Sequence, residues 1–214
     1  YIIVFNKLKL KGRNDYKMNY VGIDVGLSGS ISIYDGKSLT IKKMPTYKIE
    51  DNTYSNWYDI VELLNIFNSI KPFKAILEYQ RPMSKQGVTS MFRLGRGFGL
   101  LEGLIATTSE EYKIIDPKLW QNYFIKKYLT KDEKIYFKEK TKNIDYILNQ
   151  IKIVEFKNFL TSYSTKKSFS LSKFKSMFIY QKICLENSLF TFSKDHNIID
   201  SILISLFCFE NCRH

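Results

Sequence analysis

Three isolated carboxylates stand inside apolar segments of the sequence. Asp24 and Glu78 each end a short apolar run, and Asp200 interrupts a longer one. A carboxylate beside a buried segment costs free energy unless its charge is compensated. A hard divalent cation prefers oxygen ligands and can compensate several carboxylates together. Two such ions could activate water and stabilise the leaving oxygen of a phosphodiester, so the three residues indicate metal-dependent hydrolysis.

Each carboxylate also has an ordinary explanation when it is taken alone. Asp24 could close the turn before Gly26, Glu78 could lie on the surface at a strand end, and Asp200 could lie on the outer face of a helix. All three, however, stand on an apolar element of the type that a shared site needs. The combination therefore favours one site over three unrelated surface residues.

The elements that would position these residues alternate along the chain. Apolar alternation and turn residues predict strands at 21–24, 30–34, 39–43, 73–79 and 112–115, and helical periodicity predicts helices at 56–70, 89–107, after Asp116-Pro117, and at 197–210. The order β-β-β-α-β-α-β-α with a closing helix is typical of an α/β fold in which helices cover a mixed sheet. Adjacent strand ends and a facing helix could then bring the three carboxylates together.

The length of 214 residues fits one domain. We expect residues 1–17 to form a basic, irregular tail and residues 18–214 to form the domain. Between about 130 and 192 the pattern weakens and Lys, Ser, Phe and Asn dominate, which predicts a helical insertion with a flexible segment at 162–172. The first residue is Tyr1 rather than Met, so a targeting segment could have preceded it.

The chain carries 33 Lys and Arg against 21 Asp and Glu, a formal net charge of +12. This surplus favours a polyanionic partner, nucleic acid first and an acidic membrane surface second. Most of the cations are Lys in a composition typical of AT-rich coding sequences, so the charge is a weak indicator. No apolar run approaches the roughly 20 residues of a membrane span. The few cysteines and histidines argue against a zinc finger or a disulfide framework, and we expect Cys208 and Cys212 to lie in the core.

Several segments resemble one nuclease family. Residues 21–26, the strand ending in Glu78, and residues 194–204 are similar to the three signature segments of RuvC-type Holliday junction resolvases. The phage and chloroplast branch is the most similar in appearance, because its Gln-Gly and glycine-rich helix are matched by residues 86–99 and its Pro-x-x-Trp helix start by residues 116–120. The resemblance covers about residues 20–124 and 194–206, and the insertion has no match.

The resemblance implies an RNase H-like fold and a metal site formed by Asp24, Glu78 and Asp200. It implies Mg²⁺ or Mn²⁺, two ions per site, and no small-molecule cofactor. A fourth ligand is expected, for which we favour Asp195, with His196 as a nearby general acid/base or phosphate contact. Asp195 could instead only cap the final helix, and His196 could be a packing residue. Which of the two completes the site stays open.

By the same resemblance the protein would be an endonuclease that resolves four-way DNA junctions by symmetric nicking, in DNA recombination and repair. It would act as a homodimer, since two equivalent sites can cut two like strands, and without a membrane partner. A plastid-like branch suggests a DNA-containing organelle, and a viral or cytoplasmic location is the alternative. Activity should rise with pH as the ligands ionise and water is more readily activated.

The loop after Glu78 and the helix beyond it are expected to contact DNA. Their cationic side chains could hold phosphates, Gln86 could contact a base edge, and Phe92 or Met83 could wedge against an unstacked base step. The full predicted set comprises Arg81, Met83, Lys85, Gln86, Phe92, Arg93 and Arg96.

Gly95, Gly99 and Gly103 place a bare stripe along this helix. Each costs about 0.5–1 kcal/mol relative to Ala in a helix interior, so the stripe predicts a close neighbour. That neighbour is either the sheet beneath or the helix of a second subunit.

Other function classes share parts of this pattern. Residues 22–30 also resemble the first phosphate motif of actin and the sugar kinases, but no second Asp-x-Gly motif and no Gly-Gly adenosine motif follow. A related nuclease that acts on flaps or RNA–DNA hybrids would use the same carboxylates and is the main alternative. A non-catalytic junction-binding protein is disfavoured because all the proposed acids are present.

Overall fold

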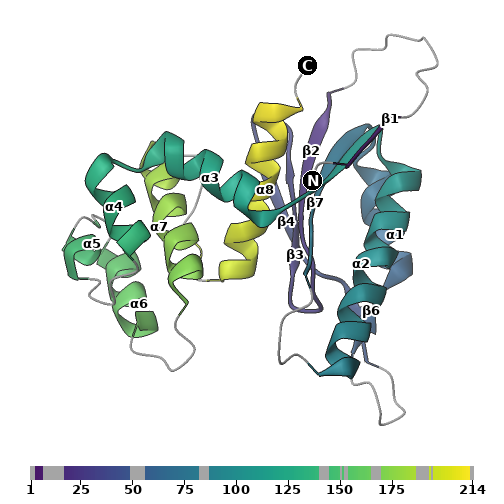
Figure 1. The fold of residues 1–214 in the computed structure, drawn as a ribbon. Helices are drawn as coiled ribbons and strands as arrows, with labels where there is room; N and C mark the ends of the chain where they lie inside the picture. The colour runs from purple at the N-terminus through teal and green to yellow at the C-terminus, as the bar shows by residue number, and fades with distance from the viewer. Residues whose placement is uncertain are drawn as a thin grey trace.

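The core of the protein is a mixed β-sheet. The computed structural model describes residues 3–6, 17–48, 56–81, 87–139, 145–149, 151, 154–164, 170–186, 193 and 195–212. Five strands in the order β8-β7-β2-β3-β4 form the body of the sheet, and β1 adds a sixth strand at the β8 edge (Figure 1). Their bounds are β1 (Ile3–Asn6), β2 (Asn19–Asp24), β3 (Ser30–Tyr34), β4 (Leu39–Lys43), β7 (Phe73–Glu78) and β8 (Glu111–Ile115).

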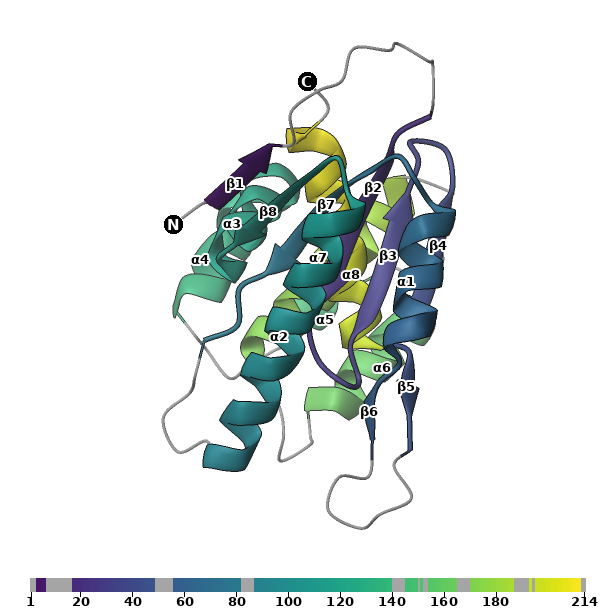
Figure 2. The same cartoon turned by 90° about the vertical axis from the view of Figure 1, so that its right-hand side faces the viewer.

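Helices cover both faces of the sheet, so the predicted α/β class is confirmed. On one face lie α1 (Ile60–Ser69) and α2 (Val88–Thr108), and on the other lies α8 (His196–Asn211) (Figures 1 and 2). Behind α8 pack the remaining helices: α3 (Pro117–Tyr128), α4 (Lys131–Glu139), α5 (Asp145–Asn149), α6 (Val154–Ser164) and α7 (Leu171–Glu186). Among the helices of the described residues, none has the length and apolarity that crossing a bilayer requires.

The insertion between 130 and 192 is built from helices in its described parts. Helices α4 to α7 all fall within it, and α7 packs against both α3 and α8. Of the predicted flexible segment 162–172, residues 165–169 lie outside the described residues. Buried side chains of α3, α7 and α8 join one apolar core on this side of the sheet, while α1 and α2 close a second core on the other.

Helix α8 lies directly on the backbone of β2, and a glycine makes this contact possible. A Cβ atom added at Gly22 would lie 2.3 Å from both the Ser201 carbonyl oxygen and the Ser205 backbone nitrogen. No side chain fits at that distance, because real carbon contacts are close-packed at 3.5–4.0 Å. Gly22 thus sets how near α8 comes to the sheet.

Three buried hydroxyls join α8 to β3. The Ser201 Oγ lies 2.7 Å from the Ser30 Oγ and 2.6 Å from the Ser32 Oγ. The Ser30 hydroxyl also donates to the Asn197 carbonyl oxygen at 2.8 Å, and the Asn197 side chain donates to the Ser28 carbonyl oxygen at 2.7 Å. Buried polar groups need such partners to avoid a desolvation cost. The start of α8 is therefore tied to both β3 and the turn that precedes it.

Two segments differ from the sequence-based expectation. The helix predicted over 56–70 begins at Ile60, because Asp59 caps it by accepting a hydrogen bond from the Glu62 backbone nitrogen at 3.0 Å. The preceding pair forms strand β6 (Trp57–Tyr58), which pairs with β5 (Thr46–Tyr47). Residues 3–6, expected in an irregular tail, pair antiparallel with β8 as β1.

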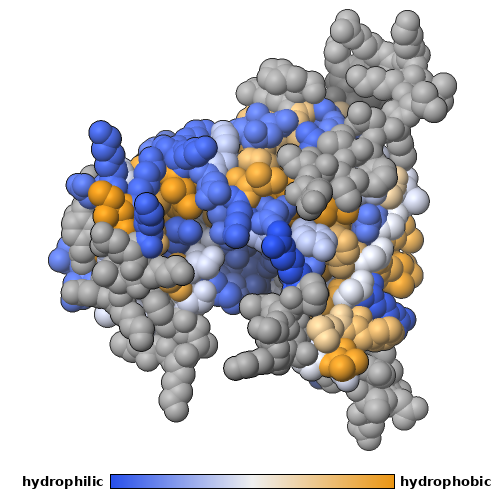
Figure 3. All heavy atoms as spheres, in the orientation of Figure 1, coloured by the Kyte–Doolittle hydropathy of each residue, from blue (hydrophilic) through white to orange (hydrophobic). Residues whose placement is uncertain are grey.

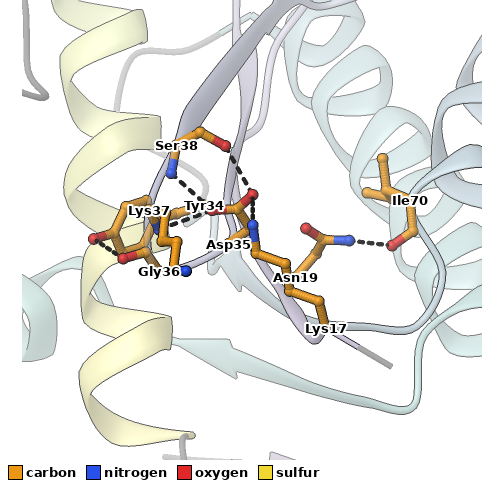
Figure 4. A network of polar contacts seen from close by, with 8 residues as sticks. All are labelled: Lys17, Asn19, Tyr34, Asp35, Gly36, Lys37, Ser38 and Ile70. Carbon is orange, nitrogen blue, oxygen red and sulfur yellow. Dashed lines mark hydrogen bonds and ion pairs between the residues drawn. The ribbon is translucent and has the colours of Figure 1, made fainter. Parts of the chain in front are cut away.

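A polar network fixes the end of the sheet that lies far from the carboxylates (Figure 4). In the predicted turn between β3 and β4, Asp35 accepts hydrogen bonds from the backbone nitrogens of Lys37 and Ser38 at 2.8 and 2.7 Å. Lys17 forms an ion pair with the same carboxylate. Burial alone would raise the pKa of Asp35, but the bonds from Lys17 and Ser38 hold it well below its ordinary value. The hairpin is thus closed by charge-assisted bonds.

Replacing Gly22 with alanine should destabilise the protein strongly. The new methyl group would force α8 away from β2, and overpacking of this kind costs about 1–3 kcal/mol or more. Chemical denaturation of the Gly22→Ala variant measures this loss.

Gly95→Ala is the matched control for that experiment. Gly95 is exposed on α2, and no described atom lies within 4 Å of the added Cβ. This change should leave stability unchanged or raise it by about 0.5–1 kcal/mol, as expected for a helix interior. Equal losses in the two variants would contradict the role assigned to Gly22.

Candidate functional site

Two strands and one helix carry the three predicted carboxylates to the same end of the sheet. Strands β2 and β7 run parallel with Ile23 opposite Leu77, so Asp24 and Glu78 lie side by side at the C-terminal ends of these two strands. Helix α8 places Asp200 near these strand ends, because the backbone of Ser201, the next residue, lies against β2. The elements that carry the three residues are those expected from the sequence, and the role of these residues as metal ligands stays a prediction.

The electrostatics of the cluster follow from its burial and its shared negative charge. Burial, then Asp200, then Glu78 raise the pKa of Asp24 well above its ordinary value. Burial and the neighbouring Glu78 likewise raise the pKa of Asp200 to about 7. Like charges this close disfavour one another's ionised forms. Ionisation of the whole cluster is therefore unfavourable unless a cation offsets the negative charge.

One oxygen of Asp200 has no hydrogen-bond partner in the described part of the chain. The Ser176 hydroxyl hydrogen-bonds this carboxylate, whereas Asp200 Oδ1 is buried and has no hydrogen-bond partner among the described residues. A buried carboxylate oxygen without a partner costs free energy. A cation in the cluster would supply the missing partner.

Glu78 is oriented by two donors that flank it. The Trp120 indole nitrogen donates to Glu78 Oε1 at 2.9 Å, and the Gln80 amide donates to Oε2 at 3.2 Å. Burial raises the pKa of Glu78, and these two bonds oppose that rise. Trp120 reaches the site because Asp116 caps α3, accepting from the Lys118 backbone nitrogen at 2.9 Å. Trp120 was noted in the sequence only as part of a helix start.

Asp195 and His196 stand at the start of α8, and each has a local structural partner. Asp195 is the N-cap of α8 and accepts a hydrogen bond from the Asn197 backbone nitrogen at 3.0 Å. The His196 Nε2 lies 2.6 Å from the Lys173 ammonium nitrogen. Burial and then the Lys173 charge lower the pKa of His196. The capping role of Asp195 is thus observed, and its role as a metal ligand stays a prediction.

Lys173 and Ser176 belong to the site but were not found from the sequence. Both lie on α7 of the insertion, and Ser176 is buried. The Lys173 charge acts on Asp24 and Asp200 as well as on His196. Nothing in the local sequence around 173 marks it, because one Lys among many carries no pattern.

Tyr58 lies beside the loop that follows Asp24. Burial, then the Asp24 charge, raise the pKa of Tyr58 to about 12, and a backbone hydrogen bond from Gly26 opposes that rise. The ring packs on α2 at Gly97, where an added Cβ would lie 2.5 Å from Tyr58 Cε2. Gly97 therefore leaves room for the ring.

A surface hollow adjoins this loop. Its volume is about 370 Å³, and Arg93 of α2 contributes to its wall. The lining residues are Gly26, Leu27, Ser28, Asn56, Trp57, Tyr58, Ser90, Arg93 and Leu94. The cationic side chain of Arg93, near the loop that follows Asp24, would favour binding of a phosphate group in this hollow.

The residues predicted to contact DNA differ in their surroundings. Arg81 forms an ion pair with Asp116, and Arg96 lies over the Trp57 ring at 4.1 Å from the ring centre. Phe92 is 63% exposed on α2, as a wedging side chain would need to be. Arg93 lines the hollow described above. The predicted contacts at Met83, Lys85 and Gln86 lie outside the described residues.

The glycine stripe of α2 does not face the sheet. Gly95, Gly99 and Gly103 are exposed, and a Cβ on any of them would meet no described atom within 4 Å. Packing against the sheet beneath therefore does not account for the stripe. Contact with a second subunit stays a prediction.

The donor set suits a hard divalent cation in its chemistry. Carboxylate oxygens such as those of Asp24, Glu78 and Asp200 are the ligands that Mg²⁺ and Mn²⁺ prefer, and one of these oxygens is buried with no hydrogen-bond partner from the described ranges. As the side chains stand, no group of three or more His, Cys, Asp or Glu within the described ranges is arranged to hold a metal ion. An ion would have to draw the three carboxylates closer together.

Comparisons with known proteins add no identification. The sequence matches no protein-family model, and a search of curated proteins also finds no match.

The metal-free protein should lose stability as pH rises. Burial and Glu78 raise the pKa of Asp200 to about 7 from its ordinary value of 3.8, and burial and Asp200 raise the pKa of Asp24 as well, so the folded chain binds protons more tightly than the unfolded chain in this range. Raising the pH through this window removes these protons and with them stability. In chelator, Asp200→Asn should flatten the fall in Tm and raise Tm at pH 8 by roughly 3–6 °C, or about 1–2 kcal/mol.

Asp132→Asn controls for the loss of one negative charge, since Asp132 is exposed on α4 away from the cluster. It should keep the wild-type dependence of Tm on pH. If Asp200→Asn also kept that dependence, Asp200 would not be the titrating group.

Added Mn²⁺ should reverse this instability at neutral pH. A ligand that binds the folded chain alone stabilises it, by about 2.7 kcal/mol at a hundred times its Kd. The rise in Tm on adding Mn²⁺ should be lost in Asp24→Asn. An equal rise in both proteins would place the ion elsewhere.

Proposed function

We propose that this protein is a metal-dependent endonuclease with an RNase H-like fold that nicks four-way DNA junctions. The observation that supports it most directly is the buried position of Asp24, Glu78 and Asp200 at one end of the sheet, where one Asp200 oxygen has no hydrogen-bond partner among the described residues. Such a cluster is costly to keep unless it holds cations during function.

The reaction would be hydrolysis of a phosphodiester. A bond forms between the water oxygen and phosphorus as the bond from phosphorus to the leaving sugar oxygen breaks. A bound Mg²⁺ or Mn²⁺ would supply positive charge to the phosphate and make water a stronger nucleophile. Asp24, Glu78 and Asp200 would hold the ions, while Trp120 and Ser176 keep two of these carboxylates oriented.

The surfaces around the cluster suit a nucleic acid substrate. The net charge of +12 attracts a polyanion, and the hollow lined by Arg93 adjoins the loop after Asp24. The exposed Phe92 offers an apolar wedge, which suits a distorted or branched duplex. Junction specificity rests on the resemblance of residues 86–99 and 116–120 to the resolvase segments.

A homodimer would complete this function. The exposed stripe at Gly95, Gly99 and Gly103 leaves α2 open to close approach by an equivalent helix. Two sites related by a two-fold axis would cut two like strands of one junction.

Cleavage of a labelled synthetic four-way junction tests the proposal. With Mg²⁺ the protein should make paired nicks confined to the junction, and chelation should abolish them. Asp24→Asn should reduce cutting by at least about 10³-fold while junction binding is kept, since loss of a group that acts on the transition state lowers rate more than affinity.

Linear duplex, flap and RNA–DNA hybrid substrates separate the alternatives. If the protein cut a flap or an RNA–DNA hybrid in preference to the junction, that nucleic acid would be its substrate and the junction proposal would be wrong. Tight junction binding without cutting would indicate an architectural protein. Cutting that survives Asp24→Asn would place the active site elsewhere.

A further inference from the structure

We propose that Lys173, which the helical insertion contributes, is a phosphate-contacting residue of the active site whose ammonium donates hydrogen bonds to a non-bridging oxygen of the scissile phosphodiester. The inference rests on the proposed nuclease function. The helical insertion matches no segment of the resolvase family, and this inference gives it a role in the reaction.

The position of Lys173 follows from how α7 packs. Helix α7 lies against α8, and Ser176, one turn after Lys173, reaches Asp200. The Lys173 Nζ lies 2.6 Å from His196 Nε2, so the imidazole holds the ammonium at the start of α8. The positive charge of Lys173 lowers the pKa of Asp24 and of Asp200, opposing the rise caused by burial, and these two acids lie on two other elements.

The ammonium retains hydrogen-bonding capacity at this position. A lysine ammonium has three donors, and the contact with His196 uses one of them. Within the described ranges, no carboxylate forms a salt bridge with Lys173, whereas Lys182 on the same helix pairs with Glu133 at 2.6 Å. Lys173 therefore lies near the acidic cluster and, within the described ranges, forms no ion pair with any of its carboxylates.

An anionic substrate group fits this arrangement. Once cations occupy the carboxylates, the ammonium would face the phosphate rather than the acids. A phosphodiester gains negative charge as water attacks, and a preorganised cation stabilises that charge. Lys173 keeps its protons in this step: the proton of the attacking water passes to solvent, and the leaving sugar oxygen takes a proton from solvent.

The shape of the molecule places the insertion beside such a substrate. The face shown in Figure 3 is hollowed between the insertion helices and the sheet, and the recessed surface is hydrophilic. The start of α8, which carries His196, lies at the same level in Figure 1. A strand lying there would contact both sides of the hollow.

A purely internal role for Lys173 makes the opposite prediction. If the ammonium only neutralises the carboxylates when no metal is bound, its removal should tighten metal binding and leave cutting unchanged. The two roles are therefore separated by measuring the cutting rate at saturating metal together with the affinity for Mn²⁺.

The experiment compares Lys173→Gln, Lys173→Arg and the control Lys175→Gln. Lys175 lies two residues further along α7, and its own pKa is lowered by burial alone. Single-turnover cutting of the junction is measured at saturating protein and Mg²⁺, and Mn²⁺ binding is measured by calorimetry on the free protein. Lys173→Gln should cut about 10–100-fold more slowly, with Mn²⁺ binding unchanged or tighter, in line with the loss of one charged transition-state contact. Lys173→Arg should lie between Lys173→Gln and the wild type, and Lys175→Gln should match the wild type.

Each contrary result has a distinct meaning. If the wild type cuts the junction and Lys173→Gln cuts it at the same rate, the inference about Lys173 would be overturned and the nuclease proposal would stand. Equal slowing in Lys175→Gln would show that any change in α7 disturbs the fold. A wild type that binds Mn²⁺ but cuts none of the substrates would overturn both proposals.

Discussion

At Gly22 the backbone of α8 approaches the backbone of β2 so closely that no side chain could stand between them. Everything at the carboxylate end of the sheet depends on this approach. It carries Asp200 to the strand ends of Asp24 and Glu78, and it gives α7 a surface on which to pack. The arrangement of Asp24, Glu78 and Asp200 as a candidate site thus depends on one steric condition in the middle of a strand.

The assembled site is electrostatically expensive. Asp24 and Asp200 lie buried together, so each makes ionisation of the other less favourable. The two apolar cores on either side of the sheet must supply the stability that this arrangement removes. Proteins keep such unfavourable clusters at functional positions, and sites that bind ions recover the cost when the ion is present.

The sequence allowed the α/β class and most element positions to be predicted, because each rests on a local pattern, whereas the role of the three carboxylates as metal ligands stays a prediction. Asp24 and Glu78 end apolar strands, and strands β2 and β7 then bring them together. Trp57 was misassigned to a helix, since its apolar spacing fits both a helix and a buried strand, and the cap at Asp59 decides between them. Lys173 could not be predicted, because its position depends on how α7 packs in three dimensions.

The hydroxyl contacts between Ser30, Ser32 and Ser201 have a consequence for motion. A slide of α8 along the sheet by half a turn, about 2.7 Å, would take the Ser201 hydroxyl out of hydrogen-bonding distance of Ser30 and Ser32 and leave buried hydroxyls without these partners. These buried hydroxyls therefore oppose small sliding movements of α8 on the sheet. Because Asp200 precedes Ser201 in the chain, the same contacts hold the Asp200 backbone in place relative to β2 and β3.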